Sequence, residues 1–334
     1  MTDYVGSNSY LIKFNPNATG AQKRFNSVYQ IPGNKPALII LGGALTTTDN
    51  KAFGYIEHIA NAIPNTRDID IYSAVYQFES LDPMLVKAHA FRRAGRKLKL
   101  DDNISIAQRK EQQLKQINDA EPVPGYIEDL FDSIIAPRIV TNNPQATNKN
   151  MRGLVIYSHC HGAIVVNRLA EMTEAALKDA GMTPDMIAQS MSGIIVIQHN
   201  PTAPLENARF TTLNFMSGTD DTLNYYDDFS KTVLQKADLA PAFLGKDYAN
   251  VFIAGKLNAT NGSEHGFSIG FDSAQDKLTP DGRVIFDAQK NALRNAVEYA
   301  KTGASLPAVE QIANGGDVNI SQMRDLGRQI YKAR

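Results

Sequence analysis

The only cysteine of this 334-residue chain, Cys160, lies between His159 and His161 and is followed by Gly162. Apolar runs stand immediately before and after this group, which is the pattern of a strand that turns sharply into a helix. A thiolate at such a turn is a nucleophile, and the helix N-terminus and a nearby imidazole stabilise it. The residue types therefore predict covalent chemistry at Cys160. A small buried side chain that only packs is the alternative interpretation.

The residues at 158–162, Ser-His-Cys-His-Gly, have the spacing of a nucleophile elbow, G-x-S-x-G, with cysteine in place of serine and serine in place of the first glycine. Small residues two positions before and after the nucleophile let the strand and helix approach closely. On these residues the chain resembles the α/β-hydrolase superfamily, in particular its lipase-like and esterase-like boxes. The cysteine is similar to that of dienelactone hydrolases and polyhydroxyalkanoate synthases. The resemblance covers about residues 35–300 and implies one α/β-hydrolase domain over 1–334.

The resemblance also assigns partners to the nucleophile, because in this family an acid and then a histidine follow it, each just after a later strand. It implies that Asp221 is the acid, with Asp220 as the one-residue alternative, and that His265 is the base. His265 would take the proton of Cys160, and the acid would hold the imidazole in place. The alternatives are an ordinary Asx turn at the two aspartates and a loop histidine at 265.

An oxyanion hole and a substrate-binding rim are further implied by the resemblance. One amide of the hole would come from Gly43 or Ala44, which follow an apolar run, and the other from His161. Three residues near these groups are expected to contact substrate: Gly42, His159 and His199. His199 is also the alternative base.

Neither a metal nor a cofactor is expected. A metal site at His159, His161 and His199 is disfavoured, because histidines two apart around a tight turn point in different directions and no carboxylate accompanies them. Gly42-Gly43 lacks the spacing and the lysine of a phosphate-binding loop. A single cysteine excludes an internal disulfide and a thiolate zinc site.

The elements that must position these residues are predicted from hydrophobic periodicity. Strands are expected at 9–14, 26–31, 37–41, 68–78, 154–158, 193–198, 210–216 and 250–255. Helices are expected from Asp49 to Pro64 and over 125–140, 163–180, 230–239 and 284–301, with a polar loop at 141–150 and a helical cap over 81–121. This alternation predicts an α/β fold, with a mostly parallel sheet and helices on both faces.

Charge and hydropathy narrow the partners. With 34 basic and 35 acidic side chains the formal charge is -1, so no global field favours nucleic acid. The basic cluster at 87–99 is interpreted as a solvated helix face or as a patch for an anionic head group or phosphate. No run is long and apolar enough for a membrane-spanning helix, and the N-terminus has no signal-peptide pattern. The default expectation is a cytoplasmic protein, and export without an N-terminal signal leaves no mark in the sequence.

The expected activity is hydrolysis of an ester or thioester through a covalent acyl-cysteine intermediate, because thiolates add readily to activated carbonyls. The substrate is expected to be a small acyl compound, with lipid-like or anionic groups as candidates. A catalytically silent binding protein on the same scaffold is the alternative from another class. A cysteine peptidase or an acyltransferase is the alternative among enzymes. The sequence predicts no particular oligomeric state.

Overall fold

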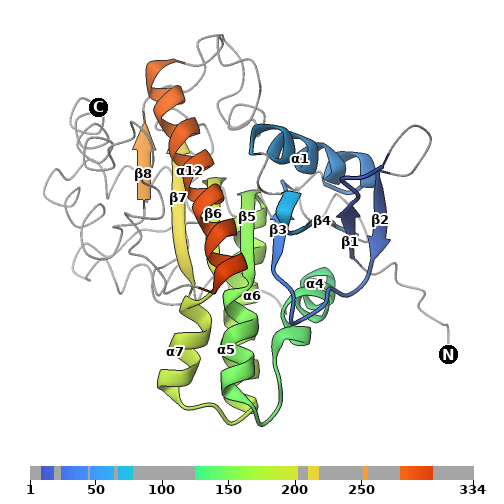
Figure 1. The fold of residues 1–334 in the computed structure, drawn as a ribbon, viewed down its shortest axis with the longest axis vertical. Helices are drawn as coiled ribbons and strands as arrows, with labels where there is room; N and C mark the ends of the chain where they lie inside the picture. Colours follow the sequence, from blue (N-terminus) through green and yellow to red (C-terminus); the bar gives the residue numbers. More distant parts are fainter. Residues whose placement is uncertain are drawn as a thin grey trace, which may run out of the picture.

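The computed structural model describes residues 9–18, 24–43, 46–63, 67–77, 125–201, 210–217, 251–254 and 279–303. Their strands form one eight-stranded sheet in the order β2-β1-β4-β3-β5-β6-β7-β8 (Figure 1). The strands are β1 Tyr10–Phe14, β2 Phe25–Val28, β3 Ala37–Leu41, β4 Asp70–Val75, β5 Leu154–Cys160, β6 Ile195–Pro201, β7 Thr211–Ser217 and β8 Val251–Ala254. The predicted α/β class is confirmed. The predicted cap over 81–121 and the predicted helix at 230–239 lie outside the described residues.

Most of the sheet is parallel. β1 runs antiparallel to both β2 and β4, whereas β4, β3, β5, β6, β7 and β8 pair in parallel. The chain therefore enters as an antiparallel hairpin at one edge and continues as a parallel sheet whose strands all end on the same side. Cys160 is the last residue of β5 and lies on that side.

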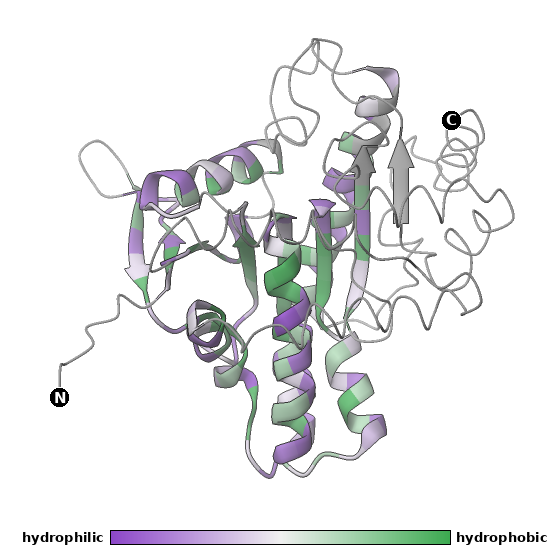
Figure 2. Ribbon diagram, turned by 180° about the vertical axis from the view of Figure 1, so that it is seen from behind, coloured by the Kyte–Doolittle hydropathy of each residue, from purple (hydrophilic) through white to green (hydrophobic). Residues whose placement is uncertain are grey.

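Helices cover both faces of the sheet. They are α1 Asp49–Ala62, α4 Gly125–Ile134, α5 Pro144–Arg152, α6 Gly162–Asp179, α7 Pro184–Ser192 and α12 Pro280–Thr302, with a short 3-10 turn at Ala136–Arg138. Helices α1 and α12 share one hydrophobic core with alternate strand residues, and α4, α5, α6 and α7 share the other. Figure 1 shows α12 in front of the sheet and α6 behind it. The central strands are hydrophobic along most of their length (Figure 2), as expected for strands buried on both faces.

The same local signal starts three of these helices. Asn143, Thr183 and Thr279 each accept a hydrogen bond from the backbone N–H three residues later, and each is followed by proline. Proline fits the first helical position because its missing N–H would have no partner there. The prediction of a polar loop at 141–150 is therefore wrong, since α5 begins at Pro144. Helix α7 is absent from the predicted elements, and α12 begins four residues before the expected start at 284.

Other boundaries differ by a few residues. The sequence pattern predicts Asp49 as the cap of α1, but the structure has Thr48 in that position, where it accepts a bond from the amide of Lys51. The helix expected over 125–140 ends at Ile134, and Pro137 lies in the 3-10 turn that follows, because its ring cannot continue an α-helical ladder. None of the described helices is both long and apolar enough to cross a bilayer.

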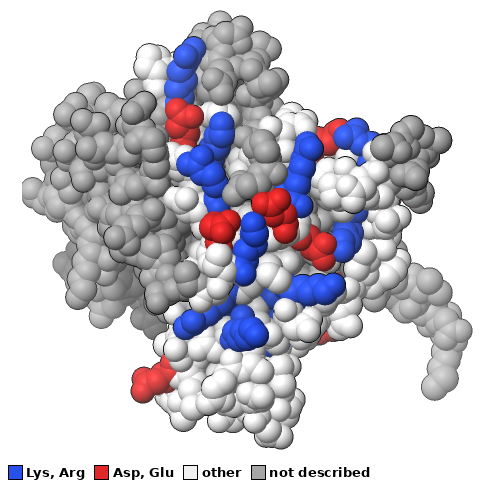
Figure 3. Space-filling model, in the orientation of Figure 1, with Lys and Arg blue, Asp and Glu red and all other residues white. Residues whose placement is uncertain are grey.

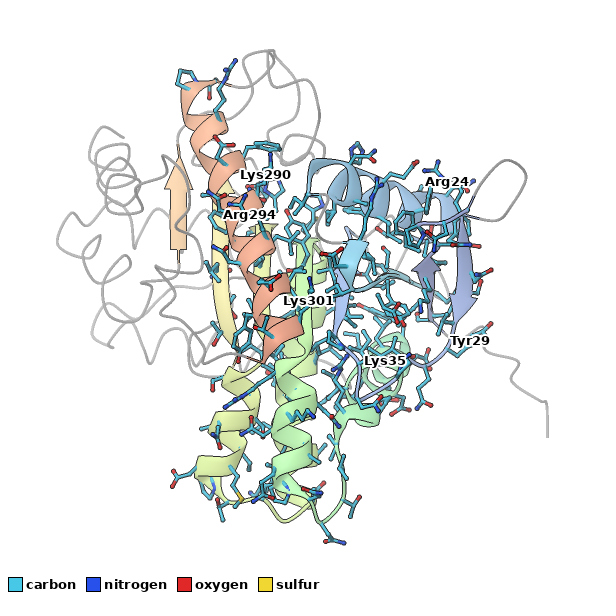
Figure 4. The ribbon with its side chains drawn as sticks, viewed as in Figure 1. Arg24, Tyr29, Lys35, Lys290, Arg294 and Lys301 are labelled. Atoms are coloured by element: carbon cyan, nitrogen blue, oxygen red, sulfur yellow. The ribbon has the colours of Figure 1, made fainter. Side chains whose placement is uncertain are left out.

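The described surface on the α12 side carries charges of both signs (Figure 3). Lys290, Arg294 and Lys301 project from α12 (Figure 4), and Lys301 contacts Asp68 at 3.1 Å. Because basic and acidic groups alternate here, this face has no single-sign field over its described residues. The basic cluster at 87–99 lies outside the described part of the chain.

Candidate functional site

Cys160 occupies a strained turn between β5 and α6. Its φ is +53°, in the left-handed region that residues with a Cβ avoid at a cost of about 1–2 kcal/mol. The strand ends at Cys160 and the helix begins at Gly162, so the predicted strand, tight turn and helix are all present. The cysteine is free of disulfide bonds and partly exposed. Such strain is typical of residues whose side chain must project from a turn for a function.

Gly162 allows the first turn of α6 to pack against β3. A Cβ at this position would collide with the backbone carbonyl of Leu41, the last residue of β3. Because the obstacle is backbone, no side-chain rotation could relieve the collision. The glycine expected two positions after the nucleophile therefore has a steric reason in this fold.

The elbow lies where the direction of strand connection reverses. From β3 the chain passes through α1 to β4 on one side, and from β5 it passes through α6 toward β6 on the other. In open α/β sheets, ligands bind outside the carboxyl ends of the strands at such a switch point. Gly43, just after β3, and Cys160 meet there, since a Cβ built on Gly43 would lie 3.6 Å from the Cβ of Cys160.

Three side chains fix the turn that follows β3. Tyr76 donates a hydrogen bond of 3.0 Å to the Gly42 carbonyl, and Thr46 donates one of 2.8 Å to the Gly43 carbonyl. The amide of Gly43 donates to the hydroxyl oxygen of Tyr55 at 2.9 Å. Burial raises the pKa of Tyr55, so its phenol stays protonated near neutral pH. The amide predicted to bind an oxyanion is thus hydrogen-bonded to a tyrosine in this structure.

His159 and His199 form a stacked pair on the side of α1 and α12. Their ring centroids are 5.6 Å apart, and His159 Nδ1 shares a hydrogen bond of 3.1 Å with Tyr55. Gln289 of α12 donates to His199 Nδ1 at 2.9 Å and accepts a bond of 2.8 Å from Tyr157. Because an amide nitrogen only donates, His199 Nδ1 is the acceptor of the Gln289 bond, and the amide nitrogen of Asn200 lies 3.5 Å from His199 Nε2.

His161 lies on the opposite face of the sheet. Its Nε2 shares a hydrogen bond of 2.8 Å with the Tyr126 hydroxyl, and its ring packs edge-on against Tyr76 with centroids 5.7 Å apart. Burial lowers the pKa of His161 to about 4, so the ring is neutral at physiological pH. The two histidines beside Cys160 therefore contact different helices. Among the described residues, no group of three or more His, Cys, Asp or Glu side chains could hold a metal ion.

Sequence reasoning did not identify the tyrosines and the glutamine of this site. Tyr55 and His159 are 104 residues apart, and Gln289 is 132 residues from Tyr157 and 90 from His199. No local pattern marks such partners, because they meet only when α1 and α12 pack on the same face of the sheet. The predicted residues Ala44, Asp220, Asp221 and His265 lie outside the described residues.

Comparison with protein-family models and with curated proteins found no match for this chain. Function is therefore inferred from the elbow and from the groups that surround it.

Proposed function

We propose that this protein is an acyl-transfer enzyme of the α/β-hydrolase type, with Cys160 as its nucleophile and an ester or thioester as its substrate. The observation that carries the proposal is the left-handed backbone of Cys160 at the carboxyl end of β5, directly before α6. The position of this turn at the switch point between β3 and β5 supports it independently.

The proposed reaction has two halves. In the first, His265 takes the thiol proton, the sulfur of Cys160 attacks the substrate carbonyl carbon, and the leaving alcohol or thiol departs with the proton that His265 returns. The product is a thioester on Cys160. In the second, His265 removes a proton from water, the hydroxide attacks the thioester carbonyl, and the C–S bond breaks to release the acid while His265 returns the proton to the sulfur. Asp221, or Asp220, holds the imidazole in its working tautomer.

The environments of the described histidines favour His265 as base. His159 Nδ1 shares a hydrogen bond with Tyr55, and His161 Nε2 shares one with Tyr126. Both ring nitrogens of His199 have amide partners, Gln289 at Nδ1 and Asn200 at Nε2, the latter at 3.5 Å. His199 would have to give up the Gln289 bond to accept a proton at Nδ1. His161 is a weak base, since burial lowers its pKa to about 4.

A catalytically silent binding protein is the second candidate, and one observation favours it. The Gly43 amide already donates to Tyr55, and the Tyr55 ring packs so closely that a Cβ on Gly42 would lie 2.7 Å from it. In an active enzyme the oxyanion donors would then be the amides of Ala44 and His161.

Intact-mass analysis with p-nitrophenyl acetate tests the proposal. Acetyl transfer should add one acetyl group on Cys160 and none in Cys160→Ala, and the adduct should then decay in water. His265→Ala should slow both steps by about a hundredfold or more, the usual contribution of a general base. His199→Ala is the matched control, and it should retain most of the rate. A protein that never acetylates would refute the enzyme and leave the binding protein, whereas equal losses in the two histidine variants would contradict the assignment of the base.

The acid is tested by the pair Asp221→Asn and Asp220→Asn. Only one of these variants should lose activity, because a single carboxylate orients the imidazole. Loss of activity in Asp220→Asn alone would identify Asp220 as the acid in place of Asp221. Full activity in both variants would contradict the triad.

A further inference from the structure

Three polar side chains form a line across the middle of the parallel sheet. Ser158 of β5 is the direct register partner of Gln198 of β6, and Gln198 is the direct partner of Asn214 of β7. Facing residues on neighbouring strands project from the same side of a sheet. We call these three residues the polar row. It is bounded by the next register partners, Leu41 on β3 and Val251 on β8.

The polar row lies on the face of the sheet that α6 covers at β5 and β6. The residues two positions before Ser158 and Gln198 are Ile156 and Val196, and both belong to the hydrophobic core that includes Val165 of α6. Side chains alternate along a strand, so Ser158 and Gln198 share that face. Ser158 also lies only two residues before the nucleophile, about 7 Å along a strand. The polar row is therefore next to the elbow, on the side where α6 begins.

Among the residues that the structure describes, the side chains of the polar row have no hydrogen-bond partner. All three residues are 0% exposed. The hydroxyl oxygen of Ser158 and both polar amide atoms of Gln198 and of Asn214 make no hydrogen bond. Buried polar groups nearly always bind protein, ordered water or a ligand, and an unsatisfied one is costly. Three of them side by side form a set of donors and acceptors that no described residue completes, and that a group from outside the described residues can complete.

The chemistry of the polar row defines that group. Two side-chain amides and a hydroxyl offer donors and acceptors together, and none of the three residues carries a charge. A carboxamide complements them best, because its N–H and C=O can pair with amides on two neighbouring strands at once. A charged group would be buried without a counter-charge in the polar row.

We propose that the polar row binds a carboxamide carried by the acyl part of the substrate, the part that stays attached to Cys160. The inference rests on the proposed function for the role of Cys160, but the binding position itself follows from the unpartnered side chains. It narrows the substrate class from acyl compounds in general to acyl groups that end in a neutral amide.

Alkylation of Cys160 tests this without requiring turnover. Two chloroacetamides of matched size are compared: in one the nitrogen bears a propyl chain that ends in a carboxamide, and in the other the chain ends in an isopropyl group. Rates are followed by intact mass on the wild type, Gln198→Met, Asn214→Leu and Ser190→Ala. Ser190 is the matched control, because it too is buried with an unpartnered hydroxyl but lies on α7.

The wild type and Ser190→Ala should react with the carboxamide reagent about tenfold faster or more than with the isopropyl reagent, a factor expected for one or two additional hydrogen bonds. In Gln198→Met and Asn214→Leu the preference should disappear. Equal rates in the wild type, or a preference that survives both substitutions, would overturn the proposal. So would a rise in the unfolding midpoint of the two variants without any change in preference, which would mean that the polar row holds only water.

A second readout separates this proposal from the proposed function. If Cys160 reacts with neither reagent, the nucleophile is inaccessible or inert and the enzyme proposal fails. Butanamide should still raise the unfolding temperature of the wild type but not of Asn214→Leu, because binding to the folded state stabilises it. The absence of that difference would refute the polar row as a binding site.

Discussion

The strain at Cys160 can be measured directly by comparing two substitutions at one position. Cys160→Ala keeps a Cβ on a backbone with φ of +53°, whereas Cys160→Gly removes it. A residue with a Cβ loses about 1–2 kcal/mol in the left-handed region. Glycine avoids this steric cost, but the greater conformational freedom of its unfolded chain lowers the free energy of unfolding by about 0.5–1 kcal/mol. Cys160→Gly should therefore be more stable than Cys160→Ala by about 0.5–1 kcal/mol.

The neighbouring residue supplies the control. His161 has φ of −58° and ψ of −29°, in the right-handed helical region, where glycine has no steric advantage. His161→Gly should therefore be less stable than His161→Ala by about 0.5–1 kcal/mol. Comparing glycine with alanine at each position cancels the loss of the native side chain. The sign of the difference should reverse between two adjacent residues.

Urea unfolding of the four variants, followed by circular dichroism, gives the free energies of unfolding from the midpoints and slopes. Glycine less stable than alanine at both positions would refute the elbow geometry, and with it the observation that carries the proposed function. A changed slope in one variant would mean that the compactness of a state has changed, and that pair would then be compared by hydrogen exchange.

Three further predictions concern Gly162 and His161 beside the elbow and Arg138 near the amino-terminal ends of β3 and β5. Gly162→Ala should destabilise the protein by about 1–3 kcal/mol through overpacking against β3. The control Gly54→Ala should stabilise it by about 0.5–1 kcal/mol, because this position is helical and an added Cβ would meet nothing within 4 Å. Thermal unfolding measures both variants, and an unchanged stability in Gly162→Ala would contradict the close approach of α6 to β3. Burial lowers the pKa of His161 from 6.5 to about 4, so the unfolded chain binds more protons than the folded protein between these pH values. The free energy of unfolding should therefore fall by at most about 3 kcal/mol as the pH drops from about 6.5 to 4. Urea midpoints across this range should fall less steeply in His161→Gln, and the same pH dependence in that variant would refute the role of this ring. Arg138 is fully buried and donates hydrogen bonds to three backbone carbonyls. Arg138→Met should therefore lower the free energy of unfolding in urea by about 3 kcal/mol or more. A decrease below about 1 kcal/mol would mean that water replaces the guanidinium as donor.

Much of the fold was predictable from the sequence because its signals are local. The apolar runs at 37–41 and 154–157 form strands, and the small residues around Cys160 form the turn. The starts of α5 and α7 are equally local, although hydrophobic periodicity alone does not reveal them. Asn143-Pro144 and Thr183-Pro184 each carry a cap and a proline, and this pair of signals is sufficient to predict both helices.

The sequence by itself determined where the thiol lies and which backbone conformation it takes, since a strand, a tight turn and a glycine within a few residues depend on short-range sterics. Only the tertiary structure decided what surrounds the thiol. The hydrogen bond from Gly43 to Tyr55, the bond from Gln289 to His199 and the polar row all depend on the register of strands and on which face each helix covers. Those choices follow from burying apolar surface contributed by segments far apart in the chain, and no short stretch of sequence records them.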